Sequence, residues 1–157
     1  MPFCGSGTTI RVTAYTEFQE EKMNELLHAS ARAIGTWLEA KLPILGANWW
    51  VENVVNRLTF QQQRLAEQKD VYALDGLDFA AVLRVLDQNW NELAGALQLP
   101  REARSWVKEL QSVRNRWAHA PLGGVNHHDV FIDVDTLERL LRALSADEYL
   151  LNHISEF

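Results

Sequence analysis

The residues of this sequence whose types and spacing could do chemistry fall within one hexapeptide, Arg114 to His119, which reads Arg-Asn-Arg-Trp-Ala-His. Asn115 and His119 are spaced i, i+4, so on a helix the amide can fix the orientation or tautomer of the imidazole. An imidazole can take a proton from a ribose 2′-hydroxyl or return one to the leaving 5′-oxygen, while a guanidinium neutralises charge on the phosphoryl oxygens. This trio would suit metal-free RNA cleavage, although a single histidine at a helix end is more often a structural cap.

The segment that carries this hexapeptide is predicted to be an amphipathic helix over residues 101–119. At about 100° per residue its apolar arc contains Ala103, Trp106, Val107, Leu110, Val113, Trp117 and Ala118. The opposite side contains Arg101, Arg104, Lys108, Asn115 and His119. Such a basic stripe is typical of a phosphate-binding surface, but it is also what a solvated helix face looks like, and Glu102 and Glu109 dilute it.

Arg114 differs from the other cations because the helical wheel places it on the flank of the apolar arc. A guanidinium in that position needs an anionic or hydrogen-bonding partner. Arginine, amide and imidazole would therefore meet one groove only if a second surface closed over this helix. A symmetric dimer could provide that surface.

The bulk properties of the chain exclude several classes of protein. With 157 residues and 47% apolar content, we expect one domain with a sizeable core. The net charge of −6 argues against a protein that coats nucleic acid through a general field, so any RNA contact must be local. A single cysteine, no run of about 18 apolar residues and no secretory signal indicate a cytoplasmic protein without a membrane span.

The chain divides into a tail, residues 1–15, and a helical domain, residues 16–157. The tail is expected to be disordered or to form a short strand, because residues 8–14 alternate weakly in polarity. Thr16 and Gln19 have the form of a capping box, so a first helix is predicted over residues 17–41.

The remaining hydrophobic periodicity predicts further helices. A second helix is expected over residues 48–67, and a third begins after Asp78 and continues to Leu97. Pro121 and the following glycines end the fourth helix. The fifth and sixth are predicted over residues 135–144 and 146–154. The expected fold is all-α, an up-and-down helical bundle of four core helices plus one or two C-terminal helices.

Two stretches of the sequence, residues 77–93 and 107–119, closely resemble domains of the HEPN superfamily. They are most similar to the branch found in the C-terminal region of the yeast nuclear RNA-surveillance endonuclease and in many bacterial defence-type proteins. The resemblance covers roughly residues 20–145, and Arg114, Asn115 and His119 match the family's motif position for position.

The resemblance implies a homodimer whose two motif helices face each other across one composite cleft. Active members cut RNA without metal or cofactor and leave 2′,3′-cyclic phosphate and 5′-hydroxyl ends. His119 would then be the general acid/base, Arg114 the ligand of the phosphate and transition state, and Asn115 the residue that holds the histidine and the cleft in register. Candidate RNA-binding residues are Arg101, Arg104, Lys108, Arg116, His127 and His128.

The sequence departs from one branch of the family directly after the motif. Toxins controlled by a nucleotidyltransferase antitoxin often have a tyrosine two residues after the histidine, whereas this chain has Ala120-Pro121. Control by adenylation is therefore not expected, although another antitoxin or a fused effector domain is an expected partner. The leading hypothesis is an endoribonuclease with a toxin or antiviral defence role. The alternative is a catalytically silent RNA-binding or dimerisation module of a larger protein.

Other candidate sites in the sequence are weaker. His127 and His128 invite a metal interpretation, but adjacent histidines on a loop point in different directions and no third ligand is suitably spaced. We therefore expect no metal, and these histidines could instead line the RNA cleft. Cys4 has no base partner in the sequence, and the segment Gly5-Ser6-Gly7 lacks the lysine of a phosphate-binding loop.

Overall fold

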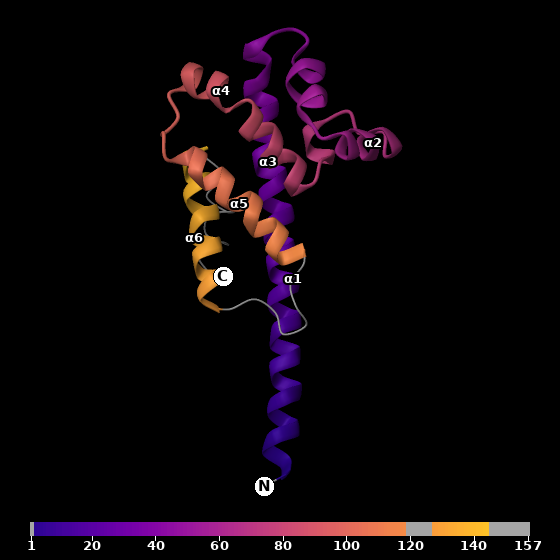
Figure 1. Cartoon of the computed structure of the whole chain (residues 1–157), viewed down its shortest axis with the longest axis vertical. Coiled ribbons are helices and arrows are strands. Elements are labelled where there is room, and N and C mark those ends of the chain that lie inside the picture. The colour runs from indigo at the N-terminus through magenta and orange to yellow at the C-terminus, as the bar shows by residue number, and fades with distance from the viewer. Residues whose placement is uncertain (1, 119–126, 145–157) are drawn as a thin grey trace.

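The computed structural model describes residues 2–118 and 127–144, and it places side chains for residues 21–113, 115 and 129–144. This part of the chain is all-α and contains no β-strand. The α-helices are α1 (Pro2–Lys41), α2 (Phe60–Gln68), α3 (Phe79–Gln88), α4 (Trp90–Leu97), α5 (Ala103–Ala118) and α6 (His127–Ala143). Figure 1 shows α1 as the long axis, with its N-terminal half extending beyond the other helices.

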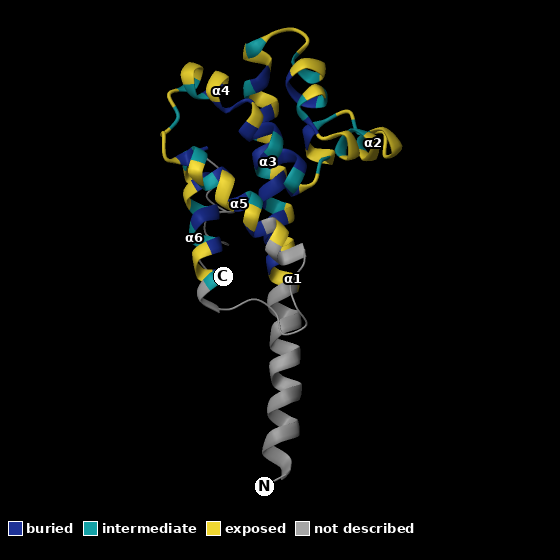
Figure 2. Cartoon of the chain, viewed as in Figure 1, coloured by how far each residue is buried: buried dark blue, intermediate teal, exposed yellow. Residues whose placement is uncertain are grey.

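The core forms where four helices meet, because each of them buries one apolar stripe there. α1 packs against α3 and α6, while α5 lies between α3 and α6. Neighbouring helices α3, α5 and α6 alternate in direction, and the buried residues gather between them and α1 (Figures 1 and 2). The fully buried side chains include Leu26, Ile34, Leu38, Leu83, Leu86, Leu110, Leu137 and Leu140. Burying one such side chain contributes roughly 1.5–3 kcal/mol, so this interface stabilises the fold. The arrangement of the helices confirms the predicted helical bundle.

The N-terminal part of the chain differs from the prediction. Residues 2–15 belong to α1 rather than to a tail or strand, so the expected boundary at residue 16 falls inside a helix. Thr16 is therefore not an N-cap. Once formed, a helix extends by one hydrogen bond for each residue added, and a proline is tolerated in its first turn, where Pro2 lies. The predicted C-terminal end at Lys41 is confirmed, and the 3₁₀ turn Leu42–Leu45 follows it.

The helix predicted over residues 48–67 is wrong because three separate elements occupy this range. These are the π-helical turn η2 (Trp50–Val54), the 3₁₀ turn η3 (Val55–Arg57) and α2. Thr59 ends the first part and caps α2: its hydroxyl accepts from the Gln62 amide at 3.1 Å, and its own amide donates to the Gln62 side chain at 3.0 Å. This reciprocal capping box requires an extended Thr59 backbone, which a continuous helix could not provide.

The third predicted helix begins where expected but is divided in two. Asp78 caps α3 by accepting a hydrogen bond from the Ala81 amide at 2.9 Å, as predicted. The expected continuation to Leu97 is interrupted at Asn89, whose φ of −102° and ψ of 7° are not helical. Its buried side chain donates to the Val85 carbonyl at 2.7 Å, in a local side-chain to backbone bond that competes with regular helix geometry.

The last described helix, α6, begins at His127, eight residues before the predicted start at 135. Asp129 lies in its first turn, where a carboxylate interacts favourably with the helix dipole. The predicted helix over residues 146–154 lies outside the described residues. Within the described ranges, every helix is too short or too polar to cross a membrane.

Candidate functional site on helix α5

Helix α5 carries the predicted functional residues, and its amphipathic sequence determines how it is seated. Ala103, Val107, Leu110 and Val113 recur at intervals of three and four and are at most 3% exposed. They pack α5 against α3 and α6 and turn its opposite side outward. The predicted apolar arc is thus confirmed for these four residues, while Trp106 is half-buried.

The motif from Arg114 to His119 begins in the last turns of α5. Asn115 is exposed on the helix surface. The backbones of Arg114, Arg116 and Trp117 lie on α5 and their side chains are outside the described set, while His119 lies outside the described residues altogether. The catalytic assignment of Arg114, Asn115 and His119 therefore stays a prediction from the sequence.

The outward face of α5 has a charge arrangement that the sequence prediction missed. Lys108 Nζ lies 3.1 Å from Asp87 Oδ2, and Arg104 Nε lies 3.8 Å from Asp87 Oδ1. Asp87 comes from α3 and its side chain is only 8% exposed. Both candidate RNA ligands thus share one carboxylate beneath them. A signal was available, because Asp87 lies four residues after buried Leu83, and a carboxylate on an apolar helix face needs a cationic partner.

The acidic residues expected to dilute the basic stripe lie in different environments. The Thr136 hydroxyl of α6 is hydrogen-bonded to a Glu109 carboxylate oxygen at 3.2 Å, so Glu109 interacts with α6. Glu102 lies exposed before the start of α5, next to the exposed Arg101. The half-buried Arg104 and the exposed Lys108 are therefore balanced by Asp87 below them rather than by their neighbours along the helix.

His127 and His128 form the start of α6 rather than a loop, and their side chains lie outside the described set. Their suggested contact with RNA is untested. Among the residues whose side chains are placed, no three histidine, cysteine, aspartate or glutamate side chains are grouped so that they could hold a metal ion.

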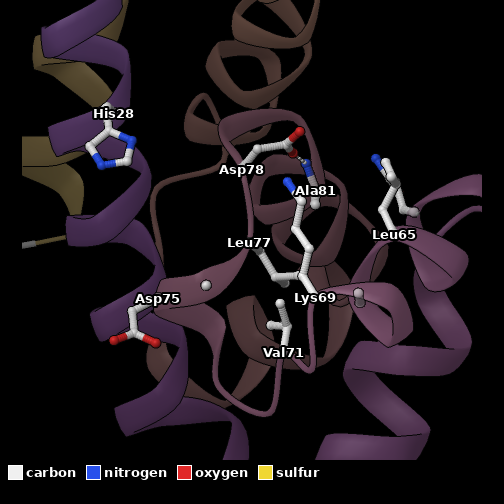
Figure 3. A pocket seen from close by; sticks show the side chains of 11 residues that line it. His28, Leu65, Lys69, Val71, Asp75, Leu77, Asp78 and Ala81 are labelled. Carbon is white, nitrogen blue, oxygen red and sulfur yellow. Dashed lines mark hydrogen bonds between the residues drawn. The ribbon is translucent and has the colours of Figure 1, made fainter.

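A separate cavity of about 250 Å³ lies between α1, α2, the connection to α3, and the start of α3. Figure 3 shows His28 projecting from α1 on one side and Leu65 from α2 on the other, with Lys69, Val71 and Leu77 between them. The Asp78 carboxylate in its rim already caps α3. No residue of α5 lines this cavity, so it is distinct from the basic face.

Comparison with known families agrees with the sequence resemblance. The model of the family described as Swt1-like HEPN matches residues 23–145, which include the last 19 of the 40 residues of α1, all of α2 to α5, and α6. No curated protein and no solved structure matches the chain significantly. The match contains the whole of α5, the complete motif and Asp87. The chain therefore belongs to the Swt1-like HEPN family.

Proposed function

We propose that this protein is a metal-independent endoribonuclease whose active site forms between two copies of the chain. The proposal is based on the Arg114-Asn115-His119 motif, which begins on α5 and lies within the region of the family match. HEPN domains are generally ribonucleases, so the family supports this reaction class.

The proposed reaction uses only groups of the RNA and the protein. The ribose 2′-oxygen attacks the adjacent phosphorus, the bond to the 5′-oxygen breaks, and the products are a 2′,3′-cyclic phosphate and a 5′-hydroxyl. His119 takes the proton from the 2′-hydroxyl or returns one to the 5′-oxygen. Arg114 neutralises the charge that develops on the phosphoryl oxygens, and Asn115 holds the imidazole in place.

The proposed dimer follows from the helical wheel of the sequence, which places Arg114 on the flank of the apolar arc. Its guanidinium can meet the same phosphate as His119 only if a second surface closes over the end of α5. A second copy in a symmetric dimer supplies that surface and a second imidazole, so that one can accept a proton while the other donates one.

The resemblance to bacterial defence proteins favours a cytoplasmic toxin or antiviral effector. An antitoxin or a fused effector domain would then be its natural partner. RNA cleavage in cells would need such control, because an unregulated endoribonuclease damages its own host.

The decisive experiment incubates labelled single-stranded RNA with the purified protein in EDTA. We expect cleavage by the wild type, and a loss of at least about 100-fold for His119→Ala and for Arg114→Ala, the scale typical of removing a general acid/base or a group that stabilises transition-state charge. His28→Ala is the matched control, because His28 is an exposed histidine beside a cavity that no α5 residue lines. Cleavage that survives both motif substitutions would refute the proposed active site.

A second candidate function is a non-catalytic RNA-binding module. The specific observation in its favour is the cation pair Arg104 and Lys108, whose side chains solvent reaches on α5 independently of the motif. RNA binding without cleavage by the wild type would identify this function, and light scattering would show whether the module is a dimer.

A further inference from the structure

We propose that Asp87 is a positioning residue, which holds Arg104 and Lys108 as a two-cation site for one phosphate of the RNA backbone. This inference rests on the proposed function in one respect, namely that RNA binds the outward face of α5. It does not require that the protein cuts RNA.

Asp87 and its neighbour Asn91 contact Lys108 and Arg104 on the side of these cations that faces the protein. Lys108 Nζ donates to Asp87 Oδ2 at 3.1 Å. Arg104 Nη1 donates to the Asn91 side-chain oxygen at 3.2 Å, while its Nε faces Asp87 Oδ1 at 3.8 Å. That last distance is too long for a hydrogen bond, and both atoms are buried without a hydrogen-bond partner. Arg104 is thus oriented from two helices, α3 and α4.

The burial of the three charged side chains differs in a way that favours anion binding. The Asp87 side chain is 8% exposed, whereas those of Arg104 and Lys108 are 42% and 57% exposed. The carboxylate therefore lies beneath the cations, and solvent reaches the cations from outside. Two positive charges against one negative charge leave a surplus of one, on a chain whose net charge is −6.

The spacing of the two cations suits a single phosphate. Arg104 and Lys108 are one helical turn apart on α5, which corresponds to roughly 6 Å along the axis. Guanidinium and ammonium groups form short charge-assisted hydrogen bonds to phosphate oxygens. Because Asp87 and Asn91 already restrict the side chains, less conformational entropy is lost when the phosphate binds.

Two roles for Asp87 predict opposite effects of its removal. If it only neutralised the face, Asp87→Asn would raise the local positive charge and tighten RNA binding. If it positions the cations, the same substitution releases them and weakens binding although the protein becomes less negative. The sign of the change therefore separates the two roles.

The experiment measures the affinity of single-stranded RNA in EDTA at several KCl concentrations, in a His119→Ala background that keeps the RNA intact. Asp135→Asn is the matched control, because Asp135 pairs with Arg139 at 3.1 Å on the exposed surface of α6. Both substitutions change the net charge from −6 to −5. The control should bind within about twofold of its parent, as expected for an exposed pair.

We expect Asp87→Asn to weaken binding about 5- to 20-fold, with a salt dependence smaller by roughly 0.7 for each phosphate that the protein no longer binds. Binding equal to the control, or tighter, would overturn the inference. Circular dichroism checks that the variant is folded. If it is not, Asp87→Glu keeps the charge and shifts the carboxylate by one methylene, and an unchanged affinity for that variant would equally overturn the inference.

The outcomes also separate this inference from the proposed enzyme. A wild type that cuts RNA, combined with tighter binding by Asp87→Asn, refutes only the positioning role. A wild type that binds but does not cut refutes the enzyme and leaves the Asp87 comparison decisive. If the wild type bound no RNA at all, both would be wrong.

Discussion

The buried amide pair between Asn53 and Asn89 is expected to contribute strongly to stability. The Asn53 side chain donates to the Asn89 side-chain oxygen at 2.9 Å, and the Asn89 side chain donates to the Asn53 carbonyl at 2.8 Å. Asn53 is 7% exposed and Asn89 is completely buried. This pair joins η2 to the junction of α3 and α4, close to Asp87 and the cations that it contacts.

The cost of breaking the pair follows from the groups that lose their partners. Asn89→Ala leaves one donor and one acceptor of Asn53 buried and unpaired, at about 1–3 kcal/mol each. The expected loss in the free energy of unfolding is therefore about 2–6 kcal/mol, which is a large fraction of the stability of a typical domain.

A double-mutant cycle in urea unfolding tests this explanation. Asn53→Ala, Asn89→Ala and the double variant are compared by far-ultraviolet circular dichroism, with the m-value checked for two-state behaviour. The double variant should cost at least about 1 kcal/mol less than the sum of the single variants, because it removes both partners of the side-chain to side-chain bond and leaves only the backbone carbonyl of residue 53 unpaired. Additive effects, or a loss below about 1 kcal/mol for Asn89→Ala, would refute the reasoning.

Two further substitutions test other parts of the fold. Thr59→Ala should destabilise α2 by about 1 kcal/mol and speed hydrogen exchange of the Gln62 amide. The control Thr36→Ala, in the middle of α1, should leave the exchange of the Gln62 amide unchanged. Equal effects of the two substitutions would contradict the capping role of Thr59. Leu110→Ala should lower the free energy of unfolding by about 2–5 kcal/mol, because Leu110 is fully buried between α5 and its neighbours. Ser112 is exposed on the same helix, and Ser112→Ala should change the free energy of unfolding by under about 0.5 kcal/mol in the same urea titration. A similar loss for Leu110→Ala and Ser112→Ala would argue against the core position of Leu110.

Several features of this protein could be predicted from the sequence because they depend on local patterns. The periodic apolar residues predict α5 and its buried face, and the predicted end of the first helix at residue 41 agrees with the end of α1. Asp78 was correctly identified as a cap, because its side chain bonds to a backbone amide only three residues away. The motif and the family also follow from short stretches of sequence.

The two Thr-x-x-Gln patterns show that a local sequence pattern alone does not decide where a helix begins. Thr16 with Gln19 and Thr59 with Gln62 have the same form, yet only Thr59 begins a helix. The residues before Thr59 are held by distant partners: Arg57 Nη1 donates to the Gln88 carbonyl at 2.8 Å. This contact with α3 holds the chain in a turn before Thr59, whereas α1 continues as a helix through Thr16.

The same distinction applies to the candidate site. The apolar side and the basic side of α5 could be predicted from the amino-acid sequence, since both follow from residue spacing on one helix. The position of Asp87 beneath Arg104 and Lys108, and the contact of Asn89 with Asn53, became visible only in the folded protein. Such pairs join residues 17 to 36 positions apart, and their contacts depend on how separate helices pack rather than on any local preference.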